Sequence, residues 1–378
     1  MQYTDETLNA LRQEGDPLAD AVIEALVAGG EIESVSATLR HLQTNDEPIP
    51  ADLPLVVQAY LRATDNPPPG IDPDRIARVH QFFLDDGLEV SAVLSLGAMV
   101  GCYAVPHGAK LLTMTHRLNH PARRMAETGQ FCFHLMGENA FESGGTFVPA
   151  VQKVRLIHAA VRYFLSQGGA WSVAELGVPI SQEDLLGALM LFSSQVLGGM
   201  ERLGVAAGAQ EAEDYYYVWR MAGVMLGIRA DIIPPTLAEA HGLNELLKKR
   251  HLGPSAEGVQ LTQDLVKLYE DMIPGRLFDG AVPALIRFVV EDEIADWMEL
   301  PRSGWDTVMN PVPTAGHLWE GAADSNALIR KVLDRASQAM LMGQLRMFTG
   351  GQGVQYDIPA DLRDAWGMKA AAGERASV

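Results

Sequence analysis

Three basic side chains share one stripe of a predicted helix near the middle of the chain. In the segment Lys153-Val-Arg-Leu-Ile-His-Ala-Ala-Val-Arg162, Arg155, His158 and Arg162 follow one another at i, i+3 and i+7, a spacing that lines one face of an α-helix. Almost every other position in these turns is apolar, and such a helix is normally buried. The sequence therefore predicts two guanidinium groups and an imidazole in the interior.

Buried charges of this kind need partners, because an unpaired one costs on the order of several kcal/mol. The pattern alone leaves two interpretations open: a core histidine between arginines that pair with carboxylates, or an imidazole that binds a metal. A lone imidazole suits haem b better than zinc, because haem needs only one axial protein ligand. The arginines could then pair with the haem propionates or with nearby carboxylates. Four other histidines near this segment are interpreted as surface or cap residues: His107, His116, His120 and His134.

Composition and missing motifs exclude several functions. The 378 residues carry a formal net charge of −19, so nucleic acids and anionic membrane surfaces would be repelled. Cys102 and Cys132 are the only cysteines, which leaves no disulfide framework, no cysteine-rich zinc site and no covalent haem attachment motif. The sequence also lacks glycine-rich phosphate loops, H-E-x-x-H, G-x-S-x-G and paired Glu-x-x-His motifs.

No targeting or membrane-spanning segment is expected. The N-terminus is acidic and lacks the basic and apolar regions of an export signal. The longest uncharged apolar run, Val90 to Val105, has 16 residues, fewer than the roughly 20 that span a bilayer as a helix. We therefore expect a cytoplasmic protein without a membrane span.

The predicted fold class is all-α, because apolar residues recur with the period of a helix far more than they alternate. The linker Asn66-Pro-Pro-Pro-Gly-Ile-Asp-Pro-Asp74 separates an N-terminal helical extension, 1–65, from a core domain, 75–305. Residues 306–378 are predicted to be a helical segment, near 323–348, and a flexible tail. The helices expected in the extension and the core cover 5–28 with a break at Asp16-Pro17 and an end at Gly29-Gly30, 52–64, 74–85, the apolar run to 105, 109–118, 121–136, the segment ending before Gly168-Gly169, one capped by Ser181 and Asp184, 211–228, 257–273 and 281–300.

These residues also resemble a known family. Arg155-Leu-Ile-His158-x-x-x-Arg162 resembles the core motif of the latex clearing protein (rubber oxygenase) and MpaB-like oxygenase family, DUF2236, and Arg124-x-x-x-Thr128 is similar to its second motif. The resemblance covers residues 75–305. Three further segments look like family landmarks in the expected order: Pro179–Gly187, Glu213-x-Tyr215-x-x-x-Trp219, and Leu277-x-Asp-Gly280 followed by Pro283.

The resemblance implies a globin-like multi-helix bundle around a single buried haem b, with His158 as the proximal iron ligand. Arg155 and Arg162 would hold that helix and the cofactor in place. Arg124 and Thr128 would lie on the distal side, where they polarise dioxygen or position the substrate. Characterised rubber-cleaving members use O2 to cleave double bonds of polyisoprene, a polymer too large to enter a cell. The implied substrate here is therefore a small apolar or isoprenoid-like molecule.

The chain departs from the rubber-cleaving members at Glu127. In the family that the chain resembles, those members carry a lysine just before the motif threonine, where it can cap the iron; here that residue is Glu127. Glu127 either donates or accepts a proton in the distal pocket, or pairs on the helix surface with Arg123 at i,i+4 or Arg124 at i,i+3. The catalytic glutamate of those members has no counterpart that we can assign.

Three alternatives to an O2-dependent oxygenase stay open from the sequence. A peroxide-dependent haem enzyme could use the same scaffold. A non-catalytic haem protein could act as a sensor or store. In a haem-free helical protein, the stripe of Arg155, His158 and Arg162 would be a buried polar network only.

Overall fold

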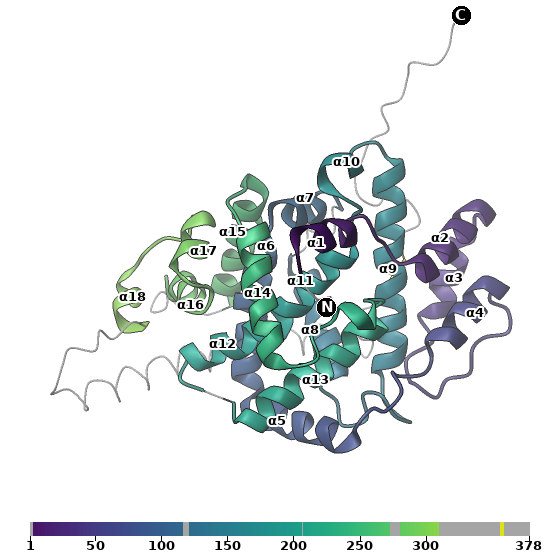
Figure 1. The fold of residues 1–378 in the computed structure, drawn as a ribbon, viewed down its shortest axis with the longest axis horizontal. Coiled ribbons are helices and arrows are strands. Elements are labelled where there is room, and N and C mark those ends of the chain that lie inside the picture. Colours follow the sequence, from purple (N-terminus) through teal and green to yellow (C-terminus); the bar gives the residue numbers. More distant parts are fainter. Residues whose placement is uncertain (1–2, 116–120, 206, 273–279, 310–355, 359–378) are drawn as a thin grey trace, which may run out of the picture.

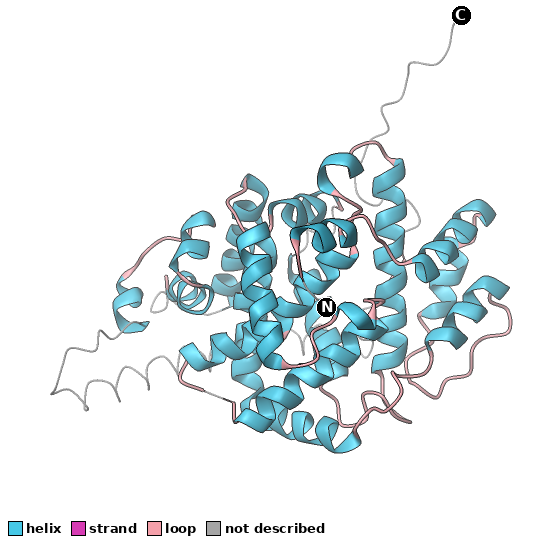
Figure 2. Cartoon of the chain, viewed as in Figure 1, coloured by secondary structure: helices cyan, strands magenta, loops and turns pink. Residues whose placement is uncertain are grey.

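The fold is built from α-helices throughout the residues that the structure, a computed structural model, describes: 3–115, 121–205, 207–272, 280–309 and 356–358. Within these ranges the structure contains no β-strand (Figure 2). The all-α fold class predicted from the helical period is confirmed.

The N-terminal helices begin and end where the sequence places turn and cap residues. Asp16 caps the second helix by accepting a hydrogen bond from the backbone of Ala19, Pro17 follows it, and Gly30 ends the helix in a left-handed conformation, as such residues favour. The predicted break and stop are thus confirmed, whereas α3 was not expected. The bounds are α1 (Asp5–Leu11), α2 (Pro17–Gly29), α3 (Ile32–Leu39) and α4 (Leu55–Thr64).

The apolar run of the sequence is helical, and the helix that leads into it is kinked at Asp86. The run continues α5 (Pro73–Ala92) through a π-helical segment, η1 (Val93–Ala98), into α6 (Met99–Tyr103). All six residues of η1 are buried. Segments of π-helix are rare and often lie at functional sites. The chain then turns into α7 (Pro106–Met114) and, later, α8 (Pro121–Leu135).

Helix α9 (Phe147–Gln167), which carries the stripe of basic residues, separates two hydrophobic cores. Its first turns, including Phe147 and Val151, pack into the larger core with α5, α6, α8 and α13. Its later turns, including Leu156 and Ala160, pack into a smaller core with α2, α3 and α4. Figure 1 shows α9 upright between these N-terminal helices and the rest of the protein. The site helix therefore contacts both parts of the fold.

The remaining helices complete the larger core. The Ser181–Asp184 capping box predicted from the sequence starts α11. The single helix expected over 281–300 is instead divided at Glu291, whose φ of 80° interrupts the helical backbone. The helix predicted near 323–348 lies outside the described residues. The elements are α10 (Val173–Leu176), α11 (Gln182–Phe192), α12 (Ser194–Arg202), α13 (Ala209–Met225), the 3-10 helix η3 (Ala230–Ile232), α14 (Leu237–His251), α15 (Ala256–Met272), α16 (Ala281–Val290), α17 (Asp292–Trp297) and α18 (Gly304–Met309).

No single helix in the described part of the chain is long and apolar enough to cross a membrane. One bent pair, Pro73–Tyr103 with Pro106–Met114, reaches the required length and composition together, with an angle of 97° between its two arms.

Candidate functional site

The two arginines of the α9 stripe pair with carboxylates of the N-terminal helices. Arg155 donates from Nε to Asp16 Oδ2 at 2.5 Å and from Nη2 to Asp16 Oδ1 at 2.8 Å. Arg162 donates from Nε to Asp20 Oδ1 at 2.7 Å and from Nη1 to the carbonyl of Ile180 at 3.1 Å. The sequence left open whether these guanidinium groups pair with carboxylates or with propionates, and in the structure both hold carboxylates.

The arginines of these two ion pairs are well shielded from solvent, whereas Asp20 is 29% exposed. The side chains of Arg155 and Asp16 are 12% and 3% exposed, and that of Arg162 is 4% exposed. Burial alone would lower the pKa of Arg155, but the hydrogen bonds to Asp16 raise it above its usual value. The pairs therefore fix α9 against α2 with charged contacts at both ends of the stripe.

His158, between the two arginines, lines a cavity of about 240 Å³. The cavity lies among α6, α7, α9, α11 and α14, and its walls are mostly aliphatic. The apolar side chains that form them include Val105, Leu111, Leu112, Leu185, Leu191 and Leu247. An imidazole among apolar walls can serve as the single protein ligand of a metal-centred cofactor.

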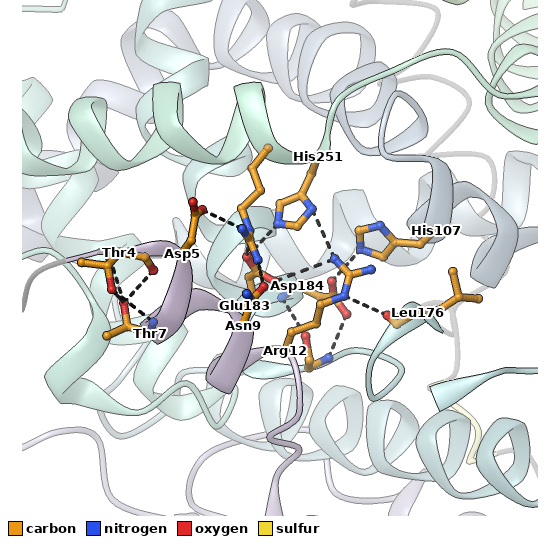
Figure 3. Close-up of polar contacts among 12 residues, drawn as sticks. Thr4, Asp5, Thr7, Asn9, Arg12, His107, Leu176, Glu183, Asp184 and His251 are labelled. Atoms are coloured by element: carbon orange, nitrogen blue, oxygen red, sulfur yellow. Dashed lines mark hydrogen bonds and ion pairs between the residues drawn. The ribbon is translucent and has the colours of Figure 1, made fainter. Parts of the chain in front are cut away.

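Two further histidines line the same cavity, and each contacts a carboxylate (Figure 3). His107 Nε2 lies 2.8 Å from Asp184 Oδ1, and His251 Nε2 lies 2.8 Å from Glu183 Oε1. The two rings meet edge to face, with their centres 5.4 Å apart. Four titratable side chains from three helices thus form one polar wall.

Both carboxylates of this wall favour their charged form. Burial alone would raise the pKa of Glu183, but hydrogen bonds from His251 and Arg250 lower it below its usual value. Burial likewise acts to raise the pKa of Asp184, and the hydrogen bond from His107 lowers it. Glu183 is fully buried, and Arg12 adds a second guanidinium 3.9 Å from its carboxylate. The wall therefore holds two ionised carboxylates, each beside an imidazole.

Sequence reasoning missed this wall. His107 was interpreted as a surface or cap residue, and His116 and His120 lie outside the described residues. Asp184 was assigned only to the helix cap, which it does form, because its second oxygen accepts the backbone N–H of Ser181 at 2.9 Å. Its contact with His107 spans 77 residues of sequence. A local pattern carries no signal for such a pair.

Arg124, predicted for the distal side, is a buried cation on α8. Its side chain donates a hydrogen bond to the hydroxyl of Tyr103 and lies 4.9 Å from the centre of that ring. Its Nε and Nη1 atoms are buried and make no hydrogen bond, and Arg124 forms no ion pair with any residue in the described ranges. Burial raises the pKa of Cys102 to about 12, and the charge of Arg124 opposes that shift. Cys102 lines the His158 cavity, so the charge of Arg124 acts on a side chain of that cavity.

Thr128 and Glu127 do not line the His158 cavity. Thr128 lines a second, smaller cavity of about 20 Å³ with Ser95 of the π-helix and Met99. Glu127 accepts a hydrogen bond from Arg123 Nε at 3.0 Å, the i,i+4 pair that the sequence allowed. Its role in proton transfer stays a prediction.

Other family landmarks have structural roles where they are described. Tyr215 and Trp219 of α13 are buried, with ring centres 6.4 Å apart, and Tyr215 donates to the carbonyl of Phe192. Gly280 has a φ of 79° and precedes α16, whereas Leu277 and Asp279 lie outside the described residues. Within the described ranges, no group of three or more His, Cys, Asp or Glu side chains could hold a metal ion.

Comparison with known proteins identifies relatives of this chain in sequence and in fold. The sequence model of the family described as ER-bound oxygenase mpaB/B'/Rubber oxygenase, catalytic domain, matches residues 92–376. A rubber oxygenase from Streptomyces sp. (strain K30) is 27% identical over 289 residues, which cover 76% of this chain and 71% of that protein. The solved structure of a latex clearing protein in the closed state shares the fold. It matches with a TM-score of 0.76 at 23% identity and covers 89% of this chain and 91% of that one.

The family match spans well over half of the chain. It includes the predicted motif residues from Arg124 to Trp219, so the resemblance read from those motifs is confirmed. The chain therefore belongs to the family of mpaB/B' and rubber oxygenase catalytic domains, and it is an oxygenase.

Proposed function

We propose that this oxygenase depends on haem b, with His158 as the proximal iron ligand, and acts with O2 on a small apolar or isoprenoid-like substrate. The observation that carries the proposal is the position of His158, which lines a largely aliphatic cavity of about 240 Å³ from the buried helix α9. Haem b needs one axial nitrogen and an apolar enclosure, and this site offers both.

Arg124 provides a separate test of whether the residues fit such a group. A buried guanidinium without a counter-ion is costly, on the order of several kcal/mol, and Arg124 has none among the described residues. Haem b carries two carboxylates, so a carboxylate of the cofactor or a polar group of the reactants would satisfy Arg124 Nε and Nη1. The residues present fit the proposed cofactor.

The remaining predicted site residues would act around this centre. Arg155 and Arg162, held by Asp16 and Asp20, would orient α9 and so the imidazole of His158. The aliphatic walls would exclude water and enclose an apolar substrate. Haem would supply the redox chemistry with dioxygen that amino-acid side chains lack. Thr128 and Glu127 do not line the His158 cavity, so the proposed hydrogen bond from Thr128 and proton transfer by Glu127 require the reactants to extend to α8.

An absorption spectrum with a pyridine haemochrome assay tests the proposal. We expect a Soret band and about one haem per chain in the wild type, both lost or shifted in His158→Ala. His41→Ala, which removes an exposed imidazole from α3's C-terminal side, is the matched control and should leave the spectrum unchanged. A wild-type protein that stays colourless after haem supplementation would refute the proposal.

Turnover experiments then separate the reactants. The haem-loaded protein should consume O2 in the presence of isoprenoid substrates. Rapid reaction with hydrogen peroxide and none with O2 would favour the peroxide-dependent alternative. An iron centre that reacts with neither would favour a sensor.

A further inference from the structure

We propose that His107, oriented by Asp184, accepts a hydrogen bond from a hydroxyl group of the substrate, so that the cavity selects an apolar alcohol over the matching ketone or hydrocarbon. This rests on the proposed function in taking the ligand of the cavity to be the substrate. The contact itself uses only side chains of this chain.

The hydrogen bonds of Asp184 fix which nitrogen of His107 carries a proton. Asp184 Oδ2 accepts the backbone N–H of Ser181 at 2.9 Å, and Oδ1 lies 2.8 Å from His107 Nε2. An ionised carboxylate only accepts hydrogen bonds, so Nε2 must be the donor. We take His107 as the neutral imidazole, in which Nδ1 is then an acceptor.

This acceptor is available to a ligand. Within the described ranges, the contact with Asp184 is the only hydrogen bond of His107. The His107 side chain is 11% exposed, and it lines the same cavity as His158. A ligand in the cavity can therefore reach the imidazole from the side that Asp184 leaves open.

Two of the neighbouring polar side chains, His251 and Lys248, are already engaged. His251 Nε2 lies 2.8 Å from Glu183, and its Nδ1 lies 3.5 Å from Arg12 Nη1. Lys248, which also lines the cavity, donates to Glu245 at 3.0 Å and to Glu291 at 3.2 Å. Of the two imidazoles in the wall, His107 is the one that keeps a ring nitrogen for a ligand.

The local charge favours a hydrogen-bond donor over an anion. Glu183 is neutralised by Arg250 at 2.7 Å, but Asp184 pairs with no arginine or lysine in the described ranges. A carboxylate brought to His107 would face this charge. A ketone would place its oxygen against the lone pair of Nδ1, and a hydrocarbon would leave that lone pair without a partner. A hydroxyl group carries no charge and donates a hydrogen bond, so it suits both the charge of Asp184 and the lone pair of His107 Nδ1.

Calorimetric titration of the full-length protein with menthol, menthone and p-menthane tests this selectivity, because the three share one carbon skeleton. We expect wild type to bind menthol about tenfold or more tightly than the other two. In His107→Phe the three affinities should fall within about threefold of one another. Equal binding of menthol and menthone by wild type, or no saturable binding of any of the three, would overturn the proposal without any variant.

Asp184→Asn provides a sharper test, because it inverts the polarity of His107. The amide oxygen must stay on the N–H of Ser181, which turns the NH2 group toward Nε2 and moves the ring proton to Nδ1. Menthone should then bind as well as menthol, since both can accept from Nδ1–H. Ser181→Ala disturbs the same helix cap but leaves the contact between His107 and Asp184, so it should keep the preference for menthol. An Asp184→Asn protein with the wild-type preference would contradict the mechanism.

Haem content measured on the same samples keeps the two proposals separate. A protein that lacks haem but prefers menthol would fail the proposed function alone. A haem-loaded protein with no preference would fail the present inference alone.

Discussion

Arg155 on α9 and Asp16 at the N-terminus of α2 form a two-point ion pair, with distances of 2.5 Å and 2.8 Å, between residues 139 positions apart in sequence. Arg162 and Asp20 repeat the contact one turn further along α2. His158 lies between the two arginines on α9. Helix α2 and its N-cap therefore bind α9 on both sides of His158, the predicted iron ligand.

Asp16→Asn should destabilise the protein by about 2–4 kcal/mol, because it leaves Arg155 buried without its counter-ion. The amide can still cap α2, so the loss reports mainly on the ion pair. The free energy of unfolding in urea measures it. Glu14→Gln is the matched control, because Glu14 and Arg229 form an exposed pair, 41% and 45% accessible, worth about 0–1 kcal/mol. Similar losses in the two variants would contradict a structural role for the buried pair.

Gly199→Ala should destabilise the protein, and the adjacent Gly198→Ala should stabilise it. A Cβ atom at Gly199 would lie 2.5 Å from Val93 Cγ1 in the π-helix, whereas one at Gly198 would meet nothing within 4 Å. Overpacking costs about 1–3 kcal/mol. Replacing an unconstrained helical glycine by alanine gains about 0.5–1 kcal/mol. Thermal unfolding of the two variants checks both signs, and a stable Gly199→Ala protein would mean that α12 does not pack closely on the π-helix.

The sequence predicted the features of this fold that depend on neighbouring residues. Asp16-Pro17 and Gly29-Gly30 are local start and stop signals, and both operate as expected. The Ser181–Asp184 capping box depends on a spacing of three. The helical period likewise identified the buried face of α9. Helix α14 was missed because its sequence is strongly polar, with buried residues only at Ala240, Leu243, Asn244 and Leu247.

The contacts that build the site depend on chain topology, which no local pattern contains. The sequence indicated that Arg155 needs an anion, but it could not choose Asp16, which lies 139 residues away. The approach of His251 to Glu183 joins residues 68 positions apart. Roles of Glu127 and Thr128 in the reaction stay predictions, because neither lines the cavity of His158.

Acidification between about pH 6.5 and pH 4 should destabilise the protein through His134. Burial, with a smaller contribution from the charge of Lys153, lowers the pKa of His134 to about 4, whereas the unfolded value is about 6.5. Between these values the unfolded chain binds the proton and the folded chain does not, so stability falls as the pH falls. The loss should approach about 2–3 kcal/mol.

Urea unfolding at pH 7.5, 5.5 and 4.5 measures this loss. In His134→Asn the fall between pH 7.5 and 4.5 should be smaller by that amount, and the amide can still hydrogen-bond to the hydroxyl of Thr146, which lies 2.5 Å from His134 Nδ1. The exposed His41→Asn variant should retain the wild-type slope. Identical slopes in all three proteins would show that His134 titrates normally in the folded state.

A separate loss of stability should begin below about pH 4.5, at Glu183. Hydrogen bonds from His251 and Arg250 lower the pKa of Glu183 in spite of its burial. A carboxylate with a lowered folded pKa contributes stability above its unfolded value, about 4.3, and loses it as the pH falls through the folded pKa.

Glu183→Gln should therefore cost about 3 kcal/mol at pH 7, where it leaves Arg250 without its buried partner. The variant should also make the decline in stability from pH 4.5 to pH 3 shallower. Glu245→Gln removes a 58% exposed partner of Lys248. It should change neither the stability at pH 7 nor its decline from pH 4.5 to pH 3 by more than about 1 kcal/mol. A Glu183→Gln protein as stable as wild type at pH 7, with the same acid decline, would show that the charge of Glu183 does not hold α11 to α14.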